Sequence, residues 1–142
     1  KSIPEEIYEN YRKRQDVREN DILLITDGTF LIGRTAIVTC FDQKLVIQSH
    51  IRRIRCLKPE KLHPYLLLYL LNTEIVQKQI EDKTFVQATI STIGNRLYEF
   101  VLPIPTDEQT VRKIISEISE IVRIKVEARR RMETLIENGK RV

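Results

Sequence analysis

The chain has few of the residues on which most catalytic motifs depend. Of its 142 residues, four are glycine, two are cysteine and two are histidine. The glycines, at positions 28, 33, 94 and 139, lie too far apart for a phosphate-binding loop. Cys40 and Cys56 fit neither a disulfide framework nor a metal motif, so we expect two reduced thiols in a cytoplasmic protein. His50 and His63 would need an unusual ligand set to complete a zinc site, so no metal is expected.

Several classes of protein are excluded by what else is missing. The sequence contains no Gly-x-Ser-x-Gly elbow, no His-Glu-x-x-His pair and no Asn/Asp-Pro-Pro-Tyr motif of adenine methyltransferases. No apolar run approaches the roughly 18 residues of a membrane span, and the first residues lack the apolar core of a signal peptide. We therefore predict no catalytic residue, no cofactor and no membrane partner. The missing initiator methionine leads us to expect a fragment or a processed chain.

Basic residues are concentrated in one stretch. The whole chain carries 24 basic and 20 acidic residues, a net charge of +4. Residues 44–61 alone hold six basic residues against one acidic residue, Glu60. A basic face can neutralise phosphates and so supply affinity for nucleic acid, although a solvated surface strand explains the charge equally well.

Periodicity predicts an α+β fold. We expect a small, mixed, β-rich body with a short helical layer, followed by one long helix. The predicted elements are a helix or extended lead-in within 1–20, a strand at 22–25, a bent strand or strand pair at 30–40, a strand at 44–57 kinked near Ser49, a helix at 63–80 interrupted at Asn72 and Thr73, and a strand at 97–104. Gly33 reads as a bulge or a point of close approach. The expected divisions are 1–105 as the body, 106–138 as the long helix and 139–142 as a tail.

The long helix is predicted from its ends and its heptads. Thr106 and Gln109 form a capping box, and Gly139 is the expected stop signal. Seven apolar residues occupy a and d positions, with Lys125 as the exception: Val111, Ile114, Ile118, Ile121, Ala128, Met132 and Leu135. The predicted helix is about 45 Å long, whereas the body has an expected radius of gyration of about 13 Å. The helix is therefore too long for the body to cover its whole apolar stripe. Part of this seam should therefore pack against a second long helix from another chain or from a missing part of this one.

Several stretches in order resemble one known family. They are residues 20–24 followed by Gly28 and Gly33, the Gln-x-His strand at 47–51, the helix at 64–71, the polar loop at 87–90, and the Pro-x-Pro then Glu-Gln junction at 101–109. The helix begins Pro-Tyr-Leu-Leu and resembles the family's Pro-x-Tyr-Leu helix. This order is similar to the target recognition domain of type I restriction-modification DNA specificity subunits and of related fused adenine methyltransferases. The resemblance covers residues 20–136. The family usually has glycine where Asn20 stands, and a glycine in the loop at 87–89.

The resemblance implies a division of labour. The body would read one half of a bipartite target in double-stranded DNA, and the long helix would fix the distance to the other half. Methyltransferase and endonuclease partners would perform the chemistry. Within this frame, Arg34, Gln48 and Gln87 are candidates for contacts to base edges. Candidates for phosphate contacts are Arg12, Lys13, Arg14, Arg52, Arg53, Lys83, Thr84 and Thr89.

Two other functions remain open from the residues. The chain could be the C-terminal recognition domain of a fused N6-adenine methyltransferase, which the upstream sequence would reveal. It could also be a coiled-coil assembly module, with a possible homodimer and no DNA binding, a reading that rests on the heptads alone. Under any of these functions, Gln48 and His50 could instead be buried structural polar groups.

Overall fold

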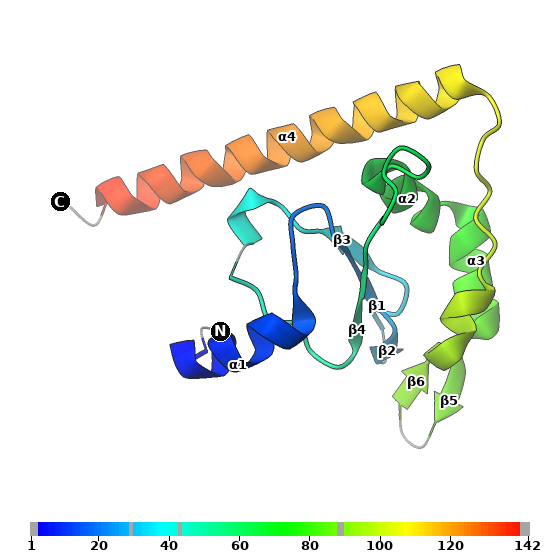
Figure 1. Cartoon of the computed structure of the whole chain (residues 1–142), viewed down its shortest axis with the longest axis horizontal. Helices are drawn as coiled ribbons and strands as arrows, with labels where there is room; N and C mark the ends of the chain where they lie inside the picture. The colour runs from blue at the N-terminus through cyan, green and yellow to red at the C-terminus, as the bar shows by residue number, and fades with distance from the viewer. Residues whose placement is uncertain (1–2, 29, 43, 88–89, 140–142) are drawn as a thin grey trace.

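Two small antiparallel sheets, a helical layer and one long helix make up the molecule (Figure 1). The structure, a computed structural model, describes residues 3–28, 30–42, 44–87 and 90–139. The helices are α1 Glu5–Gln15, α2 Pro64–Leu71, α3 Glu74–Lys83 and α4 Glu108–Gly139, with short 3-10 turns η1 Cys40–Asp42 and η2 Gly94–Glu99. The strands are β1 Ile22–Ile25, β2 Asp27–Gly28, β3 Thr35–Ile37, β4 Ile51–Ile54, β5 Phe85–Gln87 and β6 Ile90–Thr92. The α+β prediction is confirmed.

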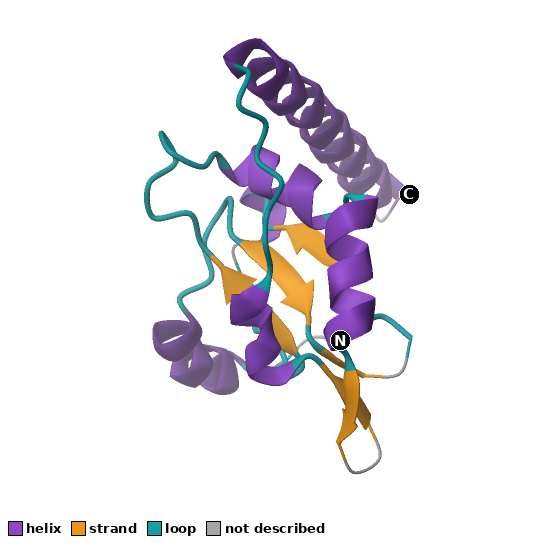
Figure 2. Cartoon of the chain, turned by 90° about the vertical axis from the view of Figure 1, so that its right-hand side faces the viewer, coloured by secondary structure: helices purple, strands orange, loops and turns teal. Residues whose placement is uncertain are grey.

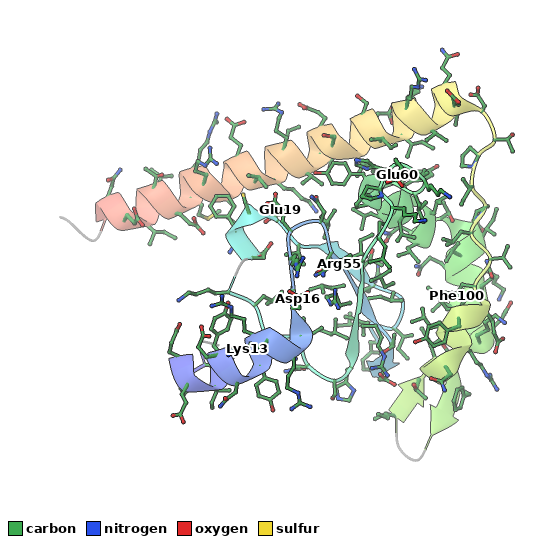
Figure 3. The ribbon with its side chains drawn as sticks, viewed as in Figure 1. Lys13, Asp16, Glu19, Arg55, Glu60 and Phe100 are labelled. Carbon is green, nitrogen blue, oxygen red and sulfur yellow. The ribbon has the colours of Figure 1, made fainter. Side chains whose placement is uncertain are left out.

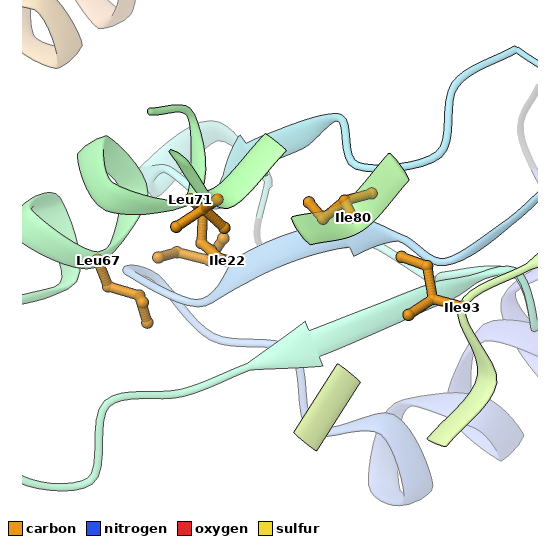
Figure 4. Close-up of a cluster of buried hydrophobic side chains, with 6 residues drawn as sticks. Ile22, Leu67, Leu71, Ile80 and Ile93 are labelled. Atoms are coloured by element: carbon orange, nitrogen blue, oxygen red, sulfur yellow. The ribbon is translucent and has the colours of Figure 1, made fainter. Parts of the chain in front are cut away.

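The first sheet has the order β3-β1-β4, and the second has the order β2-β6-β5. Ile22 on β1 lies opposite Ile37 on β3 and Ile54 on β4, so one face of the first sheet is apolar. Helices α2 and α3 cover that face. Figure 2 shows the two sheets from the side, with the β5–β6 hairpin extending away from the rest of the molecule. The core cluster comprises Ile22, Leu67, Leu71, Val76, Ile80 and Ile93, most of which are labelled in Figure 4.

Gly33 is a point of close approach, as predicted. Its φ is +85°, a region that favours glycine, and a Cβ built there would lie 3.1 Å from Ile80 Cγ2. The turn at Gly33 interrupts the strand expected over residues 30–40, because Gly33 N donates to Ile25 O and Arg34 N donates to Leu31 O. Only β3 remains of that predicted strand.

In two segments predicted as strands, a glutamine side chain binds the backbone N–H and C=O groups that a neighbouring strand would otherwise bind. Gln15 Nε2 donates to Ile47 O at 2.7 Å, and Ile47 N donates to Gln15 Oε1 at 2.8 Å. Gln79 binds both backbone atoms of Val101 in the same way, at 2.9 Å each. The predicted strand 44–57 therefore shrinks to β4. The predicted strand 97–104 is wrong. Its first residues belong to η2, and Pro103 has no backbone N–H to donate to a neighbouring strand.

Local signals predicted the helices more successfully. The interruption at Asn72 and Thr73 is confirmed, since α2 ends at Leu71 and α3 begins at Glu74. The long helix is also confirmed. Its start differs from the prediction, because Asp107 rather than Thr106 provides the cap: Thr110 N donates to Asp107 Oδ2 at 2.8 Å.

Candidate nucleic-acid interface

One end of the first sheet faces away from α4. Residues Asn20 and Val38, which flank that sheet on the opposite end, share a cavity with Val122 and Val126 of α4. At the end away from α4, Thr26 N donates to His50 O at 2.9 Å and Ile25 N donates to Arg34 O at 3.0 Å. The loops before β3 and before β4 therefore meet at this end. We call it the distal surface, meaning the residues 26–34 and 47–52 that the structure describes.

The distal surface is framed by α1 on one side and by the β5–β6 hairpin on the other. The bonds between Gln15 and Ile47 hold the C-terminal turn of α1 beside the loop that contains Gln48. On the other side, Ile93 N donates to Thr26 O at 2.9 Å, which ties the hairpin to the end of β1. In Figure 1, α1 and the hairpin lie along the bottom of the molecule while α4 crosses its top.

Three candidate base-reading or phosphate-binding residues lie at the distal end of the first sheet. Arg34, Gln48 and Arg52 are all exposed, so Gln48 is not a buried structural group. Neither arginine forms an ion pair with a described carboxylate. Their guanidinium groups remain available for phosphate or guanine, the commonest partners of arginine in DNA complexes.

The basic cluster at the end of α1 adds charge to this side. Arg12, Lys13 and Arg14 are exposed in the last turn of the helix. Arg12 Nη1 contacts Glu9 at 3.0 Å, whereas Lys13 and Arg14 form no ion pair with a described carboxylate. Gln87 is the last residue of β5, and both its side chain and the predicted phosphate contact Thr89 lie outside what the structure describes.

Three other candidates have polar atoms engaged within the fold. Lys83 Nζ lies 2.7 Å from Glu99 Oε2. Thr84 Oγ1 donates to Ile80 O at 2.6 Å, at the end of α3. Arg53 is half-buried, with Nη1 3.7 Å from Asp21 Oδ2. These side chains have roles in the fold that sequence spacing alone does not reveal.

The basic segment 44–61 does not form a single positive surface. Arg55 binds two aspartates at once. Its Nε lies 2.7 Å from Asp21 Oδ1, and its Nη1 lies 2.9 Å from Asp16 Oδ2. Figure 3 labels Arg55 and Asp16. Hydrogen bonds from Arg18 and then Arg55 lower the pKa of Asp16 from 3.8 to about 2. Lys44 Nζ contacts Glu5 at 3.2 Å. Arg55 is therefore a structural residue that joins the end of α1 to β4.

The distal surface also contains residues that the sequence did not single out as DNA contacts. Phe30 is 90% exposed and Leu31 is 58% exposed, in the loop between β2 and β3. His50 and Ser49 are exposed beside Gln48. Asp27 is the acidic residue there: burial opposes its ionisation, but hydrogen bonds from Thr92 and Thr26 and the charge of Arg52 outweigh burial and lower its pKa. These residues lie in the turns at the distal end of the sheet, and no sequence motif marks them.

Helix α4 carries two apolar faces instead of one seam. The first half of α4 packs on α2, and Val122 and Val126 share a cavity with Ile37 of β3. The half-buried apolar positions of this half are Val111, Ile114, Ile115, Ile118, Val122 and Val126. A second apolar stripe lies about 105° around the helix, at 100° per residue. We call it the outer stripe; its members are all exposed, and they are Ile121, Ile124, Ala128, Met132 and Leu135. The predicted seam thus combines three residues that lie toward the body with four that lie in the outer stripe.

The C-terminal half of α4 touches the body at one further place. Arg129 Nη1 lies 2.8 Å from Asp42 Oδ1, and the guanidinium of Arg129 lies 5.2 Å from the ring centroid of Phe41. Lys125 is exposed and forms no ion pair with a described carboxylate. This contact with η1 leaves the outer stripe uncovered.

The described residues offer no metal centre and no membrane-spanning helix. No group of three or more His, Cys, Asp or Glu side chains among the described residues could hold a metal ion. Cys40 is exposed, Cys56 is half-buried, and both are free thiols. Within the described part of the chain, no helix has the length and apolar content needed to cross a membrane. The distal surface and the outer stripe therefore remain the main candidates for function.

Comparison with known proteins agrees with the resemblance noted in the sequence. Comparison with curated proteins gives no match. The family model described as "Type I restriction modification DNA specificity domain" matches residues 3–137, which is nearly the whole chain. The chain therefore belongs to the family of type I restriction-modification DNA specificity domains.

Proposed function

We propose that this chain is a non-catalytic module that reads one half of a bipartite DNA target with its distal surface. The observation that carries the proposal is the exposure of Arg34, Gln48 and Arg52 at the same end of the sheet, away from α4. Arginine and glutamine there can bind guanine and adenine edges, and the cations of α1 can bind phosphates. Methyltransfer and cleavage would belong to partner subunits or domains.

A salt-dependent titration tests the DNA-binding role. Fluorescence anisotropy of a labelled DNA duplex is followed as the chain is added, at about 50 mM and about 200 mM salt. Three phosphate contacts would weaken binding about 40-fold between these concentrations, because counterions are released on binding. No binding at the lower salt would reject the proposal and favour the assembly-module alternative.

The outer stripe of α4 would pair with a second long helix and so fix the position of the second half-site. Its five members are exposed even though four of them are large and apolar. Two such stripes brought together would bury the apolar surface that the body of this chain leaves open. The same arrangement would serve a specificity subunit or a fused N6-adenine methyltransferase.

Replacing one residue of the outer stripe with a charged residue should therefore weaken helix pairing. Leu135 is 72% exposed, so Leu135→Glu removes an apolar contact between helices without disturbing the core. We expect at least a tenfold weaker self-association in sedimentation experiments, since burying an unpaired carboxylate costs several kcal/mol. Thr134→Glu, a neighbouring substitution away from the stripe, is the matched control and should leave association unchanged. Equal losses of self-association in the two variants would argue against helix pairing through the outer stripe.

Lys125 provides a second check on the same surface. It lies beside the outer stripe and faces solvent. If it opposes another basic residue in a pair of like helices, Lys125→Leu should tighten the pairing. Unchanged association would place Lys125 outside the contact.

A further inference from the structure

A groove runs along the free edge of strand β4. Its volume is about 740 Å³. One wall is the continuous stretch of chain from Arg52 to Lys58, and the other wall includes Leu97 and Leu102. Its floor includes Leu67 and Leu71 of α2. The groove is thus apolar at its base and runs alongside a strand.

The backbone of β4 faces this groove with unused hydrogen-bonding groups. β4 is the last strand of the order β3-β1-β4, so only one of its edges is paired. Thr26 N donates to His50 O, and hydrogen-bonded pairs alternate along an antiparallel ladder, so Arg52 and Ile54 are the residues bonded to β1. The amide and carbonyl groups of Arg53 and Arg55 then point away from β1. No described backbone bond gives them a partner on that side.

The rim of the groove is positively charged. Arg52, Lys58 and Lys61 line it without an ion pair to a described carboxylate, and Arg53 lies at 3.7 Å from Asp21. No acidic residue is among the lining residues. Glu60 lies in the same loop as Lys58 and Lys61 but does not line the groove. Two large apolar side chains at the rim, Leu57 and Tyr98, are each 86% exposed.

We propose that this groove binds an extended acidic segment of a partner protein, which adds to β4 as a further strand. Backbone groups of Arg53 and Arg55 would pair with the added strand. Because side chains alternate along a strand, every second side chain would enter the apolar floor, and the others would place carboxylates beside Lys58 and Lys61. A DNA duplex fits less well, since it offers neither strand amides nor apolar side chains.

The occupant's chemistry is set by charge and by the free edge together. Lysines on an edge strand commonly prevent self-pairing of sheets. That role alone does not account for the exposed Leu57 and Tyr98, which a purely protective edge would not need. A segment in which acidic and apolar residues alternate would pair with the free edge of β4, place carboxylates at the basic rim and place apolar side chains on the apolar floor.

A synthetic peptide tests the proposal without DNA. The probe is a fluorescein-labelled Gly-Glu-Ile-Glu-Val-Glu-Phe-Gly, titrated with the full 142-residue chain at about 50 mM salt, where exposed charges are weakly screened. Replacing every Glu of the probe with Lys should abolish binding. Methylating alternate backbone nitrogens of the probe, which removes amide donors, should weaken binding at least tenfold in one of the two possible registers.

Variants of the chain locate the binding site. Lys58→Glu reverses one charge on the rim and should weaken peptide binding about fivefold. Lys113→Glu makes the same change on an exposed lysine of α4 and should have no effect. Arg34→Ala should reduce DNA binding but not peptide binding, so that failure of the groove and failure of the DNA proposal can be told apart.

Three results would overturn the proposal. One is equal affinity for the peptide and for both N-methylated forms, which would mean electrostatic binding without the backbone hydrogen bonds of an added strand. Another is an equal loss of peptide affinity in the Lys58→Glu and Lys113→Glu variants. The third is no peptide binding together with weaker duplex binding in Lys58→Glu, which would assign the groove to nucleic acid.

Discussion

Replacing Asp21 with asparagine should lower the free energy of unfolding by about 3 kcal/mol. Asp21 is 1% exposed, and both of its carboxylate oxygens accept hydrogen bonds. Arg55 donates to Oδ1 at 2.7 Å and to Oδ2 at 2.8 Å, and the backbone amide of Arg18 donates to Oδ2 at 2.8 Å. Asparagine keeps the shape of the side chain but leaves the Arg55 guanidinium without its buried counter-charge.

The loss should fall at the lower end of the range for broken buried ion pairs. Arg55 keeps a second partner in Asp16, whose Oδ2 lies 2.9 Å from Nη1. Breaking a buried pair by removing one partner costs about 3–5 kcal/mol, because the remaining charge is poorly solvated. Urea unfolding followed by circular dichroism measures the effect, and the midpoint should fall by roughly 1–2 M with an unchanged slope.

Two comparisons separate the buried charge from other causes. Asp82→Asn removes an exposed carboxylate that pairs with Lys78 at 3.2 Å, and it should change stability little. The double variant Asp21→Asn/Arg55→Met should lose less stability than the sum of the two single variants, because the orphaned guanidinium is then absent. Strict additivity would show that Asp21 and Arg55 do not act together.

This network illustrates how far the sequence predicts the site. Charge counting placed Arg52, Arg53 and Arg55 in one basic segment. The alternation of side chains along β4 separates Arg52 from Arg53, and contacts with Asp16 and Asp21 identify Arg55 as structural. Asp16 lies 39 positions away in the sequence, so no local pattern could have revealed the pair.

Elements with local causes were predicted well. The apolar run at β1 and the interrupted helices α2 and α3 follow from periodicity and from polar residues at the break. The strands that failed depend on distant side chains: Gln15 occupies the backbone of Ile47, and Gln79 occupies that of Val101. The heptads gave a long helix correctly, yet the body covers one face of its first half and leaves a different face open in its second half.

Removing the two arginines of the distal surface should strongly reduce DNA affinity. In the double variant Arg34→Ala/Arg52→Ala, both exposed guanidinium groups are lost while the buried core stays intact. Each phosphate contact contributes about 0.9 to the slope of log affinity against log salt concentration, so the slope should fall by about 0.9 for each of the two arginines that contacts a phosphate. We expect roughly 20-fold weaker binding of the duplex at about 50 mM salt, measured by anisotropy.

A matched pair of substitutions on α4 distinguishes contact from overall charge. Arg112→Ala/Lys113→Ala removes two exposed cations that pair with Glu108 and Glu117, and it lowers the net charge by the same amount. Because exposed charges more than about 10 Å apart are largely screened at 0.1 M salt, this pair should leave the salt slope unchanged. If both double variants lose affinity equally, the distal surface is not where the chain meets DNA. If Arg34→Ala alone weakens some duplex sequences by about 1–3 kcal/mol and spares others, that arginine reads a base rather than a phosphate.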